Sequence, residues 1–201
     1  MEQADNAIDH WRVLEVKREL RNVRVRWRAN GDLVGRVTDA LVLPHRGEAV
    51  GLSVQGSDQR EYVIHAGNFL FREEQIWITP EVFHPATGLE NGVVRAGETL
   101  TGTMVLTNEG YLLGYVRRIY LRLHSRQVIY QLAEGFWDRC LGRGFFIPGH
   151  IVRGYSRDGT RMIVPFNARD QYATSTLSGL MISQESEQET AFERGEKERE
   201  Q

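Results

Sequence analysis

Apolar and polar residues alternate strictly along VRVRWR, residues 23–28. This period of two places two valines and a tryptophan on one face and three arginines on the other, as in a half-buried β-strand. The Asn-Gly dipeptide at residues 30–31 is a hairpin turn signal, and the apolar run 33–43 is the expected returning strand. Gly35 lies inside that run, where a glycine indicates a bulge, a bend or a close backbone approach.

Three further short apolar segments, 49–54, 62–66 and 75–79, are predicted strands separated by turns. Short strands at such spacing favour a small antiparallel β-barrel, because closure removes the exposed edges that a unit of this size would otherwise carry. The residues expected to face its core are Val25, Trp27, Leu33, Val37, Leu41, Val50, Leu52, Val54, Val63, Ile76 and Ile78.

The same order of segments returns later in the chain. NEGYLLGYV at 108–116 repeats the spacing of NGDLVGRV at 30–37, with Gly31 matching Gly110 and Gly35 matching Gly114. A repeated order of strands with glycines kept at one corner predicts an all-β chain built from two tandem small barrels. The expected divisions are a first barrel at 11–84, a linker at 85–96, a second barrel at 97–170 and a flexible acidic tail at 171–201.

The two copies differ most in one loop. QGSDQRE at 55–61 is replaced in the second copy by AEGFWDRCLGRG, residues 133–144. Aromatic and arginine side chains in a loop are typical of protein interfaces, so we predict a partner-binding site there. An alternative is that these side chains fold back onto the barrel end or join the two barrels. The predicted contact residues are Phe136, Trp137, Arg139, Leu141 and Arg143.

Residues 14–54, EYVIHAGNFLF at 61–71 and IWITP at 76–80 together resemble a PRC-barrel domain. GYLLGYVRRIYL at 110–121 and FFIPGHIV at 145–152 resemble a second, more diverged copy. The family includes the barrel of the photosynthetic reaction-centre H subunit and one domain of a ribosome-maturation factor. The resemblance implies a non-enzymatic adaptor whose barrel surface positions a protein partner. We do not assign the partners of those two family members to this chain, because the H subunit's membrane helix and the factor's other domain have no counterpart in this sequence.

Charge and cysteine content limit the expected partners and cellular compartment of the protein. The net charge of −2 argues against an electrostatic grip on nucleic acid by the whole protein. Residues 184–201 contribute seven Glu against two Arg and one Lys, which leaves the rest near neutral. A single cysteine, a polar first segment and no apolar run of membrane-spanning length predict a soluble cytoplasmic protein. Peripheral association with a membrane complex is left open.

No chemistry-bearing motif emerges from the sequence. The six histidines make no metal-ligand spacing with one another or with Cys140, so we predict no metal and no cofactor. Arg139 and Arg143 flank Cys140 and would lower a thiol pKa, but no partner base can be assigned to it. We therefore expect no catalytic residues, and an enzyme using Cys140 is kept only as a minor hypothesis.

The second functional interpretation is based on arginines that are expected on the barrel faces. Arg24, Arg26 and Arg28 share one strand face, and Arg118 and Arg122 flank Tyr120 on another. Arginines beside aromatic side chains can hold single-stranded RNA, so an RNA- or ribosome-associated factor is the alternative function. The preferred explanation of these arginines is the solvated face of half-buried strands.

Overall fold

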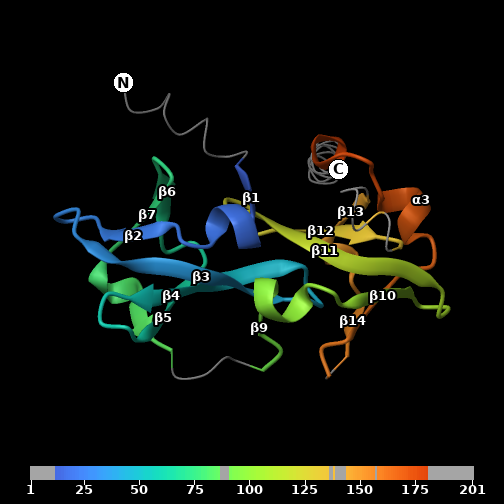
Figure 1. The fold of residues 1–201 in the computed structure, drawn as a ribbon, viewed down its shortest axis with the longest axis horizontal. Coiled ribbons are helices and arrows are strands. Elements are labelled where there is room, and N and C mark those ends of the chain that lie inside the picture. The colour runs from blue at the N-terminus through green and yellow to red at the C-terminus, as the bar shows by residue number, and fades with distance from the viewer. Residues whose placement is uncertain (1–11, 87–90, 136–137, 139–143, 157, 181–201) are drawn as a thin grey trace, which may run out of the picture.

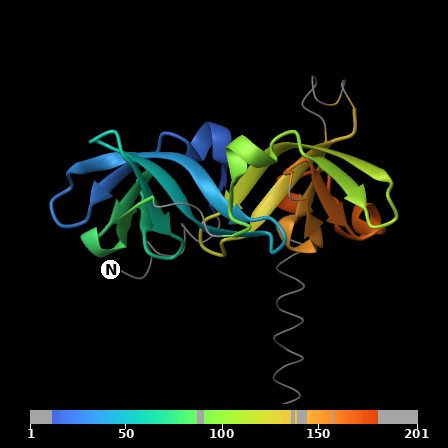
Figure 2. The same cartoon turned by 90° about the horizontal axis from the view of Figure 1, so that it is seen from below.

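The computed structural model describes residues 12–86, 91–135, 138, 144–156 and 158–180. β-strands dominate, and they form two sheets that lie side by side along the long axis of the molecule (Figure 1). The turned view separates the blue and green strands of the first sheet from the yellow and orange strands of the second (Figure 2). The prediction of a β-rich chain is therefore confirmed.

The first sheet comes mostly from the first half of the chain. Its strands follow the order β6-β7-β2-β3-β4-β5-β8, and β9 is added on β3. Their bounds are β2 (Arg24–Trp27), β3 (Leu33–Leu43), β4 (Glu48–Gly56), β5 (Glu61–His65), β6 (Leu70–Arg72), β7 (Gln75–Ile78), β8 (Phe83–Pro85) and β9 (Val94–Arg95).

The second sheet follows the order β13-β12-β11-β10-β15-β14, and β1 is added on β11. Its strands are β1 (Val13–Glu15), β10 (Met104–Thr107), β11 (Leu112–Arg122), β12 (Val128–Ala133), β13 (Phe145–Pro148), β14 (Gly154–Tyr155) and β15 (Arg161–Val164). The hairpins β2–β3 and β10–β11 point to opposite ends of the long axis (Figure 1).

Both sheets are mixed rather than purely antiparallel. β2 pairs in parallel with β7, and β10 pairs in parallel with β15, while the other pairs are antiparallel. Register shifts fall at the same points in both: between Val25 and Arg26 in β2 and between Val105 and Leu106 in β10. Among the described residues, the first and last strands of each sheet do not pair with one another, so neither sheet closes on itself. Of the expected two closed antiparallel barrels, the structure therefore shows two β-sheets.

Short helical turns connect the strands. Two π-helical turns, η1 and η3, each follow a two- or three-residue strand and lie near the middle of the molecule (Figure 2). A 3₁₀ turn follows β7, where a proline at its first position supplies the required φ. The bounds are η1 (Val16–Leu20), η2 (Pro80–Val82), η3 (Ala96–Leu100), η4 (Gly149–Ile151) and α3 (Ala168–Tyr172).

The first strand of each half joins the sheet of the other half. β1 precedes the first sheet in sequence but pairs with β11 in the second, with Glu15 opposite Tyr120. β9 precedes the second sheet but pairs with β3 in the first, with Arg95 opposite Leu41. Part of the expected linker 85–96 is thus strand, because its backbone groups find partners on β3.

A single continuous core of buried apolar side chains reaches from β1 to α3 and includes residues of both sheets. Val25, Val37 and Ile76 are fully buried, as the alternation predicts. Leu33 is 44% exposed, so its prediction as a core residue is wrong. The register shift in β2 pairs Leu33 with Arg26 at the hairpin tip, and Val34 is buried in its place.

The two corner glycines have different roles. Gly31 has a φ of 77°, which the hairpin turn requires and which L side chains rarely adopt. Gly35 has no such backbone angle, but a Cβ there would collide with the carbonyl oxygen of Gln55 on β4. Gly35 therefore permits a close approach of β3 to β4.

Residues 171–180 contact the second sheet. Phe146 of β13 exchanges two backbone hydrogen bonds with Thr174. Leu180 is 2% exposed and packs with Tyr120, Ile129 and Phe146 in a small second cluster. The predicted flexible tail at 171–201 thus includes a described stretch, up to residue 180, that is held by β13 and β11.

Candidate functional site

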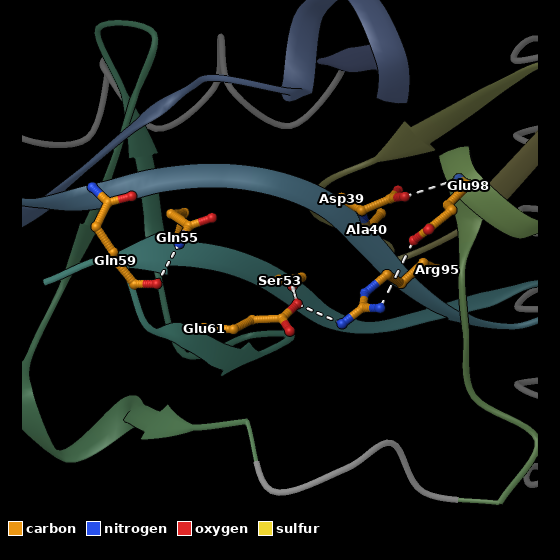
Figure 3. A network of polar contacts seen from close by, with 8 residues as sticks. All are labelled: Asp39, Ala40, Ser53, Gln55, Gln59, Glu61, Arg95 and Glu98. Carbon is orange, nitrogen blue, oxygen red and sulfur yellow. Dashed lines mark hydrogen bonds and ion pairs between the residues drawn. The ribbon is translucent and has the colours of Figure 1, made fainter. Parts of the chain in front are cut away.

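A polar groove of about 700 Å³ lies beside the first sheet, where η1 and η3 approach it. Lys17 and Arg21 line it from η1 and the residue after it, and Gly97 and Glu98 line it from η3. The sheet contributes Asp39 from β3, Glu61 from β5 and Arg95 from β9, together with Gln55 and Gln59 (Figure 3).

Asp39 anchors η3 at one wall of this groove. The residue is 7% exposed, and its carboxylate accepts a hydrogen bond from the backbone N–H of Gly97 at 2.8 Å. It also accepts one from the backbone N–H of Glu98 at 3.0 Å (Figure 3). A third bond comes from the N–H of Ala40. A buried carboxylate needs such donors, and the first N–H groups of a helical turn have no partners of their own. Asp39 therefore serves the architecture of the groove.

Arg95 joins two carboxylates across the groove. Its guanidinium lies 2.6 Å from Glu61 and 3.8 Å from Glu98, and Ser53 also donates to Glu61 (Figure 3). The hydrogen bond from Ser53, assisted by the bond and charge of Arg95 and opposed by burial, lowers the pKa of Glu61. Glu61 is therefore anionic at neutral pH and holds Arg95 in place.

The rim carries cations that lack such partners. Lys17 and Arg21 are exposed, and among the described side chains neither makes an ion pair within 4.0 Å. Three basic and three acidic side chains thus line the groove, which leaves it electrically neutral with both signs at separate points. Such a surface suits a ligand that itself carries both charges.

The predicted contact loop 133–144 lies mostly beyond reach of the structural description. Phe136, Trp137, Arg139, Leu141 and Arg143 are outside the described residues, and so is Cys140. The described residues around the loop border a second hollow of about 510 Å³. Glu134 there forms an ion pair with Arg169 of α3 at 2.5 Å, and Arg169 stacks over the ring of Phe145.

The predicted arginine faces differ from one another. Arg24 and Arg28 are exposed, but Arg26 donates to Gln75 and to the carbonyl oxygen of Gly31. On β11, Arg118 forms an ion pair with Glu15 at 3.8 Å, and its pKa is raised first by a hydrogen bond with Tyr120. Arg122 is 5% exposed. The arginines of β11 are therefore part of the packing between strands and do not form an open basic face.

Within the described part of the chain, no group of three or more His, Cys, Asp or Glu side chains is placed to hold a metal ion. No described helix has both the length and the apolar character needed to cross a membrane.

Sequence reasoning missed the groove, although one signal pointed to it. Asp39 lies directly before the apolar run ALVL at 40–43 in the expected strand, and a charge in a buried strand indicates specific partners. Those partners, Gly97 and Glu98, are 58 and 59 residues away, so only the tertiary structure identifies them.

No protein-family model matches the chain, and no curated protein matches it in sequence.

Proposed function

We propose that the protein is a non-enzymatic adaptor made of two PRC-barrel-like units, and that it binds a segment of a protein partner in the groove between the first sheet, η1 and η3. The observation that carries this proposal is the groove itself, with paired charges on its floor and unpaired cations on its rim. The matching strand order and register shifts of the two sheets support two copies of one unit.

The groove chemistry favours a partner segment with both an acidic and a basic side chain. Lys17 and Arg21 offer exposed donors for a carboxylate, and Glu98, 71% exposed at its side chain, offers an acceptor for a cation. Charges placed this way supply specificity and register rather than large affinity. The loop at 133–144 stays a predicted second contact surface for the same partner.

Position 17 lies on the rim of the groove and therefore offers a direct test. Lys17 and Lys197 are the two lysines of the chain. A photo-crosslinking amino acid placed at position 17 is expected to capture a partner that the same group at exposed Arg161 does not. The captured protein, made recombinantly, should then bind the purified chain, and Lys17→Glu/Arg21→Glu should weaken that binding at least about tenfold. Equal capture at both positions, or unchanged affinity of the double variant, would contradict the proposal.

Protection from an amine-reactive label provides an independent readout. Bound partner should slow acetylation of Lys17 and leave Lys197 unchanged, so each molecule contains its own control. Equal protection of the two lysines would indicate binding elsewhere.

The alternative is an RNA-associated factor, supported by exposed Arg24 and Arg28 at the two ends of β2. Their substitution by alanine should weaken retention on RNA and reduce its salt dependence. Arg26 is left intact in that test because its side chain holds the hairpin. If the unmodified chain shows no retention on RNA at low salt, this alternative is eliminated.

A further inference from the structure

The two exchanged strands occupy equivalent positions on their sheets. Glu15 of β1 stands opposite Tyr120 of β11, and Arg95 of β9 stands opposite Leu41 of β3. β3 has a register shift at Asp39, two residues before Leu41. β11 has one at Arg118, two residues before Tyr120. Glu15 and Arg95 therefore sit at the same place in two similar frameworks, with opposite charges.

Each of these charges meets an opposite charge on the sheet that it joins. Glu15 lies 3.8 Å from Arg118, and the Glu15 side chain is only 10% exposed. Arg95 lies 2.6 Å from Glu61. Both pairs are partly shielded from solvent, where a mismatch costs more than on an open surface.

The opposite assignment would bring like charges together. If β1 lay on β3, Glu15 would meet Glu61; if β9 lay on β11, Arg95 would meet Arg118. The turns that follow add a steric difference, since a Cβ at Gly97 would lie 3.1 Å from the Asp39 carboxylate, whereas η1 carries Lys17 as its second residue.

Both assignments are within reach of the chain, because η1 and η3 each contact β3 as well as β11. Hydrogen bonding alone does not discriminate between them, since any short strand satisfies a free edge. We propose that the ion pairs Glu15–Arg118 and Arg95–Glu61 select which strand joins which sheet, so that charge encodes the reciprocal exchange between the two halves. The exchange in turn brings η1 and η3 together and so builds the groove.

A double-mutant cycle tests the second-sheet pair. Glu15→Arg and Arg118→Glu should each lower the folded-to-unfolded ratio in urea by roughly tenfold, and the combined variant should recover most of that loss. Glu15→Gln, which removes the charge without reversing it, should have a smaller effect. Glu109→Arg in an exposed turn is the matched control and should change the ratio by less than about twofold. Additive single effects would overturn the proposal.

Disulfide trapping tests the choice of sheet directly. In a Cys140→Ser background, Val42→Cys and Val94→Cys place two thiols on paired positions of β3 and β9. Oxidation should link them efficiently with the native charges. Adding Glu15→Arg and Arg95→Glu together reverses the charges of both exchanged strands, and the yield of this cross-link should fall at least about threefold. An unchanged yield would show that charge does not direct the exchange.

Discussion

At the residue scale, a few polar side chains have structural roles that the linear pattern conceals. Asp39 is chemically similar to the many surface acids of the chain, but its carboxylate bridges β3 to the backbone of η3. Its position inside an apolar strand is visible in the sequence, whereas the identity of its partners is not. The sequence position of Asp39 therefore indicates that this residue has specific partners, but it does not show where the candidate groove lies.

Removal of the Asp39 carboxylate should destabilise the fold. Asp39→Ala leaves the buried N–H of Gly97 and the part-buried N–H of Glu98 without their acceptor, which we expect to cost about 2 kcal/mol. Urea denaturation measures the loss, and Glu109→Ala in an exposed turn is the matched control. A loss no larger than that of the control would mean that water replaces the carboxylate at no cost.

Acid should weaken the fold through Asp158. Hydrogen bonds from Ser156 and then from Thr160 lower the pKa of this carboxyl from 3.8 to about 2. Because the folded-state pKa lies below the unfolded value, the contribution of Asp158 is complete above pH 3.8 and is lost as the pH falls toward 2. Thermal melts between pH 5 and 2 should show a shallower decline for Asp158→Asn than for the unmodified chain. Parallel declines would exclude this contribution.

At the element scale, local pattern predicts strands well and their partners poorly. The period of two at 23–28 and the apolar run at 33–43 correspond to β2 and β3 within a residue or two. The parallel pairing of β2 with β7, and the reciprocal placement of β1 and β9, join segments distant in sequence. Any apolar strand of suitable length satisfies a free edge, so the apolar pattern alone does not identify these pairings.

Two glycine variants distinguish the effect of a close approach between strands from the effect of a positive φ in a turn. Gly35→Ala should cost about 2–4 kcal/mol, because its methyl group meets the Gln55 carbonyl oxygen. Gly102→Ala should cost only about 1–2 kcal/mol, because that position has a φ of 90° but open space around it. Urea midpoints compare the two variants directly. A smaller loss at Gly35 than at Gly102 would argue against the close approach.

At the scale of the whole molecule, the two sheets are joined by buried apolar side chains and by backbone hydrogen bonds. The main core runs through both, and Ala49 and Val128 donate backbone hydrogen bonds to Arg126 and Gly47 where the halves meet. These contacts cross the boundary between the expected units 11–84 and 97–170.

Both halves should therefore unfold together. The amides of Val37 and Val116 are hydrogen-bonded within the first and second sheets respectively, and their protection from exchange should vanish over the same range of urea. Cleavage at a protease site inserted between residues 88 and 89 should leave the two fragments associated on a sizing column. Separate transitions, or fragments that elute apart, would show independent units.

The reciprocal exchange also sets an order of events during synthesis. β1 leaves the ribosome early, but its edge partner β11 ends at Arg122, about a hundred residues later. At ordinary rates of translation, β1 therefore waits on the order of 10 s for that partner. β9 emerges when β3 is already available, so the first sheet can be completed while the nascent N-terminal strand is still unpaired. β1 is thus among the last strands to reach its place.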